Sequence, residues 1–218
     1  MHATHRSGRR RARLRASPGR LVRLRDGRAV VVRSAKRADG EAVQQFVREL
    51  SPLARRRRFF GALSELSPAQ LDRLTGAQIP RDLSLVALSA HAGEPRIVAM
   101  AQYATDDPGA AEFAVVVADA WQRQGLGARL LELLLGCAAE AGVQVMSGLV
   151  LSENGPMLAL AARLGFALTD DRDPDLVRLE TPLPPPSRGE RWVADRLRQF
   201  VACRPLAVAA PAFAAQAR

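Results

Sequence analysis

The feature that most constrains this chain is one segment, residues 112–166, in which strand and helix patterns alternate. A glutamate and five apolar residues predict a strand over 112–117, and leucines at helical spacing predict an amphipathic helix over 124–141. The turn between them contains two glycines, Gly125 and Gly127. Glycines let a backbone approach a ligand closely, and the free N–H groups at a helix start favour phosphate. The turn is therefore a candidate site for a phosphate-bearing ligand.

The rest of the chain surrounds this segment with shorter elements. A buried strand is expected over 144–151, and a helix over 155–164 with Asn154 as its cap. Further hairpins and helices are expected at 21–33, 39–50, 52–60, 67–74, 83–104 and 166–179. Antiparallel strands thus precede a β-α-β-α unit, which predicts an α+β domain with a mixed, mostly antiparallel sheet flanked by helices.

Composition divides the chain into three parts. Residues 1–20 contain seven arginines and no acidic residue, which predicts a basic, disordered arm. Residues 21–181 carry the strand and helix patterns and are expected to form the folded domain. Residues 182–218 read as a Pro-rich linker, a short amphipathic helix and an Ala-rich tail.

The net charge of +10, with 31 arginines against a single lysine, at first suggests nucleic acid. Residues 1–60, however, sum to +14 and the remaining residues to −4. A domain that binds a phosphate backbone usually spreads its basic residues over the folded surface, so nucleic acid is an unlikely partner. The run Arg55 to Arg58 is likewise expected to be a solvated helix face, in preference to a contact for phosphate or for an acidic protein substrate.

Several classes of protein are excluded by what the sequence lacks. No apolar run approaches the length of a membrane span, and no apolar segment follows the basic N-terminus as in a secretory signal. The two cysteines and three histidines show no metal-ligand spacing, so no metal is expected. Cys137 falls within the apolar helix and is expected in the core. A cytoplasmic protein is the prediction.

The glycine turn resembles a known signature. The pattern Q/R-x-x-G-x-G/A after a strand, matched by Gln122, Gly125 and Gly127, resembles the acyl-CoA-binding signature of the GNAT superfamily of N-acyltransferases. Asn154 at a helix start and the closing Leu164-Gly165-Phe166 resemble the second half of that signature. Neither a dinucleotide fingerprint nor a P-loop is matched. The resemblance implies a GNAT fold and acetyl-CoA as co-substrate.

A closer resemblance is to the acetyltransferase domain of bacterial protein-lysine acetyltransferases. The segments that carry it are Leu50-Ser51-Pro52, Arg58-Phe59-Phe60, Leu66 to Leu71 and Ala111 to Val117. It implies that the acceptor is a lysine of a protein, acetylated by direct attack in a ternary complex. A small-molecule amine as acceptor, and a catalytically degenerate acyl-CoA-binding module, are the alternatives.

The resemblance also implies roles for particular residues. Backbone N–H groups around the strand end would hold the pantetheine and polarise the thioester, and those of the turn would cradle the pyrophosphate. The candidate cofactor-binding residues are Val115, Val116, Val117, Gln122, Arg123, Gln124, Gly125, Leu126, Gly127, Ala128 and Asn154. Arg123 stands where the family commonly has glycine, which predicts a stiffer turn and allows an added phosphate contact.

Glu112 is the candidate catalytic base. A lysine ammonium with a pKa near ~10.4 must lose a proton before it can attack, and a carboxylate beside the thioester could remove it. No general acid is evident. Ala161 stands where many GNAT enzymes have tyrosine, and the chain's only tyrosine, Tyr103, lies elsewhere. A thiol with a pKa near ~8.5 can depart unprotonated or take its proton from water.

Overall fold

A computed structural model describes residues 19–61, 63–76, 78, 80–89, 95–107 and 109–185. Nearly all of the predicted basic arm, residues 92–94 of a predicted turn, and everything from residue 186 onward lie outside the described residues. The division of the chain into an arm, a domain and a tail therefore stays a prediction.

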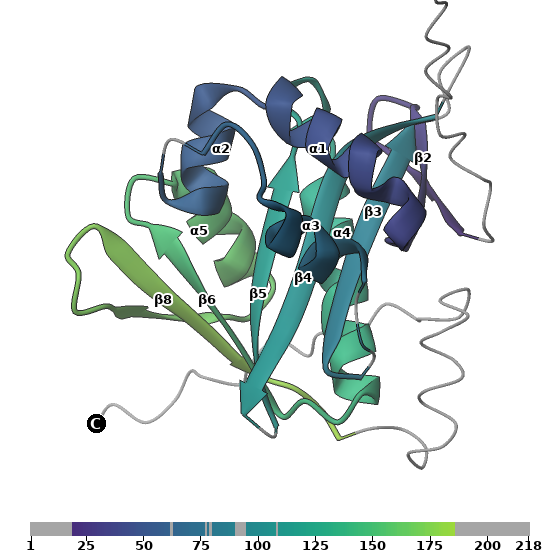
Figure 1. The fold of residues 1–218 in the computed structure, drawn as a ribbon. Helices are drawn as coiled ribbons and strands as arrows, with labels where there is room; N and C mark the ends of the chain where they lie inside the picture. The colour runs from purple at the N-terminus through teal and green to yellow at the C-terminus, as the bar shows by residue number, and fades with distance from the viewer. Residues whose placement is uncertain are drawn as a thin grey trace, which may run out of the picture.

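The described chain forms one sheet of eight strands in the order β1-β2-β3-β4-β5-β6-β8-β7 (Figure 1). The strands are β1 (Arg20–Arg23), β2 (Ala29–Ser34), β3 (Asp82–Ser89), β4 (Arg96–Asp107), β5 (Ala110–Val117), β6 (Val145–Leu151), β7 (Ala167–Asp170) and β8 (Leu176–Pro182). All neighbouring strands are antiparallel except β5 and β6, which run parallel. The predicted mixed, mostly antiparallel sheet is confirmed.

Helices cover both faces of this sheet. They are α1 (Gly40–Glu49), α2 (Pro52–Phe59), α3 (Pro68–Thr75), α4 (Leu126–Glu140) and α5 (Gly155–Arg163), with short 3-10 turns at Arg37–Asp39 and Asp119–Trp121. In Figure 1 the first three helices lie in front of the sheet and α4 and α5 behind it. One hydrophobic core lies on each side: α1 to α3 contribute to the first and α4 and α5 to the second.

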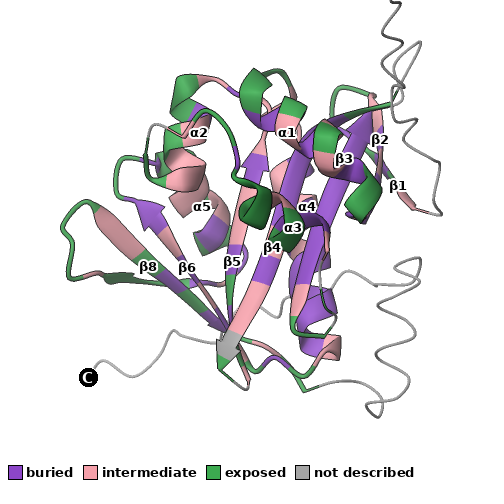
Figure 2. Cartoon of the chain, in the orientation of Figure 1, coloured by how far each residue is buried: buried purple, intermediate pink, exposed green. Residues whose placement is uncertain are grey.

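The helix α4 carries the larger core. Ten of its 15 residues are buried, including Cys137, because leucine and alanine occupy almost every position between Leu130 and Ala139. Figure 2 shows buried residues concentrated on α4 and on the central strands β3 and β4. The helix begins two residues later than predicted, since Gly125 has a φ of 86° and cannot be helical.

The parallel pair β5–β6 separates part of the way along. The strand β5 pairs with β4 as far as Val117, but with β6 only from Ala110 to Glu112, opposite Val145 to Ser147. Beyond that point β6 continues beside β8 to Leu151, and the two parallel strands diverge (Figure 1). One edge of β5 is therefore left without a partner strand from Phe113 onward.

The ring of Phe113 lies where the two strands begin to separate. It packs 5.2 Å from the ring of Phe166, and a Cβ added to Gly148 of β6 would lie 2.6 Å from its Cε1 atom. Because the ring is held between two elements and cannot move away, we expect Gly148→Ala to destabilise the fold by about 1–3 kcal/mol. Chemical denaturation measures this change.

Gly40 provides the matched control for that substitution. It lies at the start of α1 with helical backbone angles, and a Cβ there would meet nothing within 4 Å. Gly40→Ala is expected to leave stability unchanged or raise it by about 0.4–1 kcal/mol. Equal stability changes for the two variants would contradict the proposed close approach at Gly148.

A buried ion pair joins β2 to the start of α1. The guanidinium of Arg33 donates to both carboxylate oxygens of Asp39, at 2.6 and 2.8 Å, and Arg33 is 2% exposed. Asp39 is the N-cap residue of α1, but its carboxylate makes no hydrogen bond to the amides of α1. It accepts instead from Arg33 and from the N–H of Lys36, which caps the preceding 3-10 turn.

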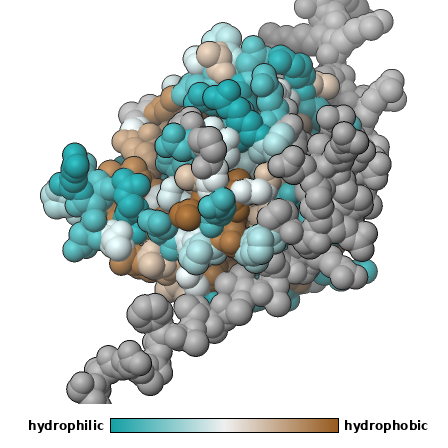
Figure 3. Space-filling model, turned by 90° about the horizontal axis from the view of Figure 1, so that it is seen from below, coloured by the Kyte–Doolittle hydropathy of each residue, from teal (hydrophilic) through white to brown (hydrophobic). Residues whose placement is uncertain are grey.

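The surface alternates in character. Seen from below, the surface is hydrophilic over the β7–β8 hairpin and along the upper edge of the view, and hydrophobic residues lie between these two areas (Figure 3). Among the described residues, no helix is both long enough and apolar enough to cross a bilayer.

Candidate active site

An open cavity of about 890 Å³ lies where β5 and β6 separate. Its walls come from both faces of the sheet: α2 and α3 on one side, α4 and α5 on the other, and β4 to β6 between them. The lining residues that bear on the chemistry are Arg57, Arg58, Arg73, Glu112, Val115, Val116, Val117, Gln122, Arg123, Gly125, Gly127, Ala128, Asn154 and Arg163. Pockets of this size hold cofactors and substrates.

The free edge of β5 presents backbone groups to this cavity. The N–H of Ala118 donates to Val98 of β4, so alternation along the strand directs the N–H groups of Val115 and Val117 away from β4. No strand pairs with β5 on that side beyond Glu112. These two amides can therefore donate to a ligand. Val116 lines the cavity through its side chain, while its N–H faces β4.

The turn after β5 is held by Gln122. Its side-chain amide donates to the carbonyl of Val117 at 2.9 Å, which closes the turn against the strand end. The N–H groups of Leu126, Gly127 and Ala128 precede the first helical hydrogen bond, from Arg129 to Gly125, and no side chain caps them. Three consecutive residues thus provide an anion site at the N-terminus of α4.

The β1–β2 hairpin supports the same turn from outside. The N–H of Arg25 donates to the carbonyl of Gln124 at 3.3 Å. Arg28 donates to the carbonyl of Ala120 at 2.8 Å and lies 4.0 Å from the ring of Trp121. These contacts from the β1–β2 hairpin fix the turn over residues 122–128, which is the predicted site of the cofactor phosphates.

Two residues of the turn adopt a left-handed backbone conformation: Arg123, with a φ of 59°, and Gly125, with a φ of 86°. A side chain costs about 1–2 kcal/mol in this region. This cost explains why glycine is common at the position of Arg123 in the family that the sequence resembles. We expect Gly125→Ala to destabilise the protein by about 1 kcal/mol or more and to weaken acetyl-CoA binding, whereas Arg123→Gly should not reduce stability.

Thermal denaturation with and without acetyl-CoA tests both variants. Gly125→Ala should lower the melting temperature and shrink the shift that acetyl-CoA produces. A loss of stability in Arg123→Gly similar to that of Gly125→Ala would contradict the strain inferred at this position.

Glu112 lies at the last paired position of the β5–β6 ladder, opposite Ser147. Its side chain is exposed to the cavity on the face of α2 and α3, the face that Val116 also occupies. Arg58 of α2 is its charged neighbour. Desolvation lowers the pKa of Arg58 to about 10, and attraction to Glu112 opposes that change. Arg58 therefore remains a cation at neutral pH.

The helix α2 is tied across the opening at both ends. At its N-cap, Ser51 donates to Asp119 of the β5–α4 turn at 3.0 Å, and nearer its C-terminus Arg56 lies 3.5 Å from Glu153 of the β6–α5 loop. The helix thus contacts the loops that follow both separated strands. It closes the front of the cavity with Arg57 and Arg58.

Most of the residues predicted from the sequence converge on this cavity. Two do not line it: Leu126 is 1% exposed and packs in the core, and Gln124 contributes its carbonyl to the turn. Asn154 is the N-cap residue of α5, as predicted, but makes no side-chain capping hydrogen bond, and it lines the cavity.

Sequence reasoning missed several lining residues and misread two. Arg57 and Arg58 were expected on a solvated helix face, yet both are partly buried and line the cavity. Arg73 and Arg163 were not singled out, because no local pattern indicates that α3 and the end of α5 reach the same opening. The only sequence signal for Arg73 and Arg163 is the presence of an arginine in a helix that is otherwise amphipathic.

Neither of the two residues considered for the general acid contributes an acid to the cavity. Ala161 is fully buried in α5. Tyr103 is 1% exposed, donates to the carbonyl of Pro80 at 2.9 Å, and has its pKa raised by burial. Within the described part of the cavity wall there is no tyrosine, cysteine or histidine, and no described cluster of three potential ligands could hold a metal ion.

The cavity between β5 and β6 can hold an elongated ligand. The free amides of β5 can polarise an acyl group, and the N-terminus of α4 can bind phosphate. These features fit a phosphate-bearing acyl donor. The comparisons agree with this class. The sequence model of the acetyltransferase (GNAT) family matches residues 48–166. Over 153 residues the chain is 38% identical to the acetyltransferase PA5475 of Pseudomonas aeruginosa, an alignment that covers 70% of this chain and 81% of that protein.

Solved structures give the same result. The GNAT domain of S. lividans PAT is similar with a TM-score of 0.69 and 28% identity, covering 76% of this chain and 97% of that one. The putative acetyltransferase yncA from Salmonella typhimurium, solved with its cofactor acetyl-CoA, has a TM-score of 0.60 and 21% identity, covering 73% and 97%. This chain belongs to the GNAT family of acetyltransferases. It is an N-acetyltransferase with acetyl-CoA as its co-substrate, as the signature predicted.

Proposed function

We propose that this enzyme acetylates the side-chain amine of lysine in another protein, by direct attack within a ternary complex, with Glu112 as the general base. One observation carries the proposal: Glu112 is the last residue of β5 that pairs with β6, and the free amides of Val115 and Val117 follow within five residues. A base and a set of oxyanion donors therefore come from one rigid strand and share one cavity.

The chemistry then follows in balanced steps. Glu112, directly or through a water, takes a proton from the lysine ammonium, whose pKa near ~10.4 keeps it mostly charged at neutral pH. The neutral amine attacks the thioester carbonyl carbon and forms a C–N bond. The amide of Val115 or Val117 donates to the oxygen as it gains negative charge. The attacking nitrogen, now a positively charged N–H2 group, loses its second proton to water. The C–S bond breaks, and the departing thiolate takes a proton from water or from protonated Glu112.

This route requires no separate acid side chain. A coenzyme thiol with a pKa near ~8.5 is a far better leaving group than the amine, so the tetrahedral species collapses by releasing sulfur. The absence of a tyrosine, cysteine or histidine from the described cavity wall is consistent with a thiolate that is protonated by solvent.

Two similarities support a protein lysine as the acceptor. The segment Ala111 to Val117, which contains Glu112, resembles that of bacterial protein-lysine acetyltransferases. The GNAT domain of S. lividans PAT also aligns with 76% of the chain at 28% identity. The acceptor of the present chain is a proposal on these grounds.

The test is to incubate a cell lysate with the purified protein and isotopically labelled acetyl-CoA, followed by mass spectrometry of proteins and of small molecules. Label on the lysines of a few proteins supports the proposal. Label confined to small-molecule amines would contradict it and favour the alternative acceptor. Binding of acetyl-CoA without any transfer would instead indicate a degenerate acyl-CoA-binding module.

A further inference from the structure

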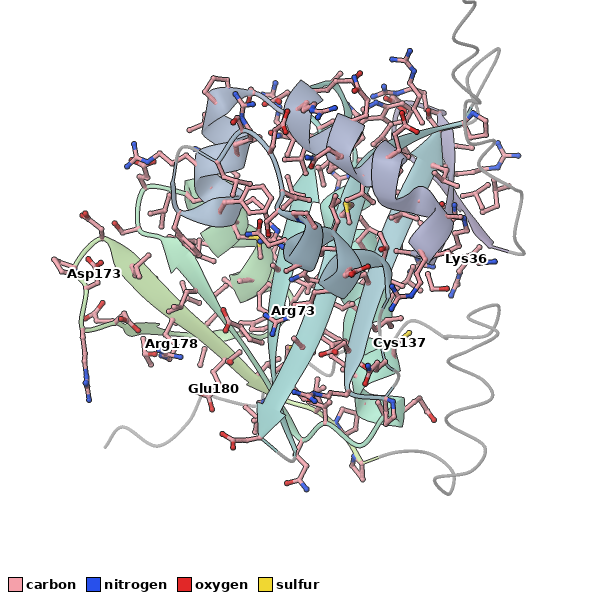
Figure 4. All side chains as sticks on the ribbon, in the orientation of Figure 1. Lys36, Arg73, Cys137, Asp173, Arg178 and Glu180 are labelled. Carbon is pink, nitrogen blue, oxygen red and sulfur yellow. The ribbon has the colours of Figure 1, made fainter. Side chains whose placement is uncertain are left out.

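Three arginines and one carboxylate line the α2–α3 side of the cavity. We call this group, made of Arg57, Arg58, Arg73 and Glu112, the acceptor mouth. All four line the cavity, and Glu112 and Arg58 interact electrostatically. Arg73 comes from α3 and extends toward the middle of the sheet (Figure 4). The acceptor mouth therefore has a formal excess of two positive charges.

Arg57, Arg58 and Arg73 line the cavity and have no anionic partner at contact distance in the described part of the chain. Arg56, in the same helix, lies 3.5 Å from Glu153, and Arg37 lies 2.9 Å from Asp72 of α3. Across the described residues, no carboxylate lies within 4.0 Å of the guanidinium groups of the acceptor mouth. The Nε of Arg57 is buried without a hydrogen-bond partner. Arg57 and Arg58 are half-buried, and a desolvated guanidinium group is costly unless an anion meets it, whereas Arg73 is exposed and free to meet a ligand.

The excess charge has a consequence for the acceptor. Two unneutralised positive charges repel an approaching lysine ammonium. Water and salt screen this repulsion poorly in a partly enclosed site. An acceptor that brings its own negative charge avoids this repulsion. The planar guanidinium fork matches a carboxylate, to which it can donate two parallel hydrogen bonds.

The cofactor does not account for this group. Its phosphates are expected at the N-terminus of α4, where Arg25, Arg123 and Arg163 supply a separate set of cations in the wall of the cavity. The acceptor mouth comes from helices on the opposite face of the sheet. Its charges remain available to the second substrate.

We propose that the acceptor of this enzyme carries a carboxylate beside its amine, and that in a protein substrate this is an acidic side chain next to the target lysine. The inference rests on the proposed lysine acetylation and specifies its substrate class. Arg73 is the residue best suited to bind the carboxylate, since it lies on α3, away from the residues that hold the cofactor.

The test uses peptides of equal length with one central lysine, flanked by glutamate, by glutamine or by arginine. With the full-length protein at low salt, we expect kcat/KM for the glutamate-flanked peptide to exceed that for the glutamine-flanked one by about tenfold, as one charge-assisted contact would give. The arginine-flanked peptide should be the poorest substrate. Added salt should reduce the differences.

Variants assign the preference to the acceptor mouth. Arg73→Gln should reduce the glutamate-to-glutamine ratio to about twofold or less. Arg73→Glu should reverse the order of the charged peptides. Arg55→Gln is the matched control, because it removes one arginine from α2 at a position that does not line the cavity, and it should keep the ratio. Acetyl-CoA binding should be unchanged in Arg73→Gln.

The possible failures are distinguishable. Equal use of the three peptides would overturn this inference and leave lysine acetylation standing. Acetylation of free amino acids but of no peptide would assign the carboxylate to a small substrate, and would overturn both the acidic-neighbour inference and the protein acceptor. If the preference for the glutamate-flanked peptide survived in Arg73→Gln but was lost in Arg55→Gln, the acceptor mouth would not be the source of that preference.

Discussion

Glu112→Gln is expected to lower kcat/KM for the amine by at least about a hundredfold at neutral pH, the range for loss of a general base. The amide is close in size to the carboxylate but cannot accept a proton. Because the side chain of Glu112 is exposed in the cavity wall, the fold and acetyl-CoA binding should be retained. Steady-state kinetics and the thermal shift produced by acetyl-CoA measure the two effects separately.

The pH profile strengthens this test. As the pH approaches the pKa of the lysine amine near ~10.4, the substrate loses its proton without help, so the deficit of the variant should shrink. Glu65→Gln is the matched control: it removes an exposed carboxylate that pairs with Arg48, away from the cavity, and should have wild-type activity. Full activity of Glu112→Gln on every accepted amine at neutral pH would exclude Glu112 as the base.

The largest effect on stability is expected from Asp39→Ala. This change leaves the guanidinium of Arg33 buried at 2% exposure without a counter-charge, and it also removes the acceptor of the Lys36 N–H. Breaking a buried pair on one side costs about 3–5 kcal/mol. For a domain of this size the melting temperature should fall by roughly 10 °C. Calorimetry or urea denaturation measures the change.

Two further variants isolate the cause. Asp72→Ala removes the partner of Arg37 in a pair whose side chains are 73% and 72% exposed, so its effect should stay below about 1 kcal/mol. Replacing both Arg33 and Asp39 by leucine should destabilise less than Asp39→Ala alone, since no unpaired charge is left in the core. If Asp39→Ala were no worse than Asp72→Ala, the pair would contribute nothing beyond a surface contact.

The Arg33–Asp39 pair illustrates what local patterns miss. Arg33 ends the segment predicted as a hairpin, and Asp39 stands at the start of a predicted helix, where a capping carboxylate is expected. The predicted strand and helix are both present. The burial of the two side chains depends on how α1 packs against the sheet, and neither residue's sequence neighbours specify that packing.

The cofactor half of the site was determined by the sequence. A strand, two glycines and a leucine-rich helix specify a turn whose main-chain N–H groups are free, and Gly125 permits the left-handed conformation that directly precedes α4. Such a site consists of backbone, and backbone conformation depends on residues that are adjacent in the chain. The family resemblance through Gln122, Gly125, Gly127 and Asn154 was therefore visible and has been confirmed.

The acceptor half was decided by tertiary structure alone. Only the pairing register shows that β5 and β6 separate directly after Glu112, and only the packing of α2 and α3 brings Arg57, Arg58 and Arg73 to that opening. These side chains come from elements up to 55 residues apart in the sequence. Segment 112–166 thus identified the acetyltransferase family, whereas the charge of the proposed acceptor mouth depends on long-range packing that no local period encodes.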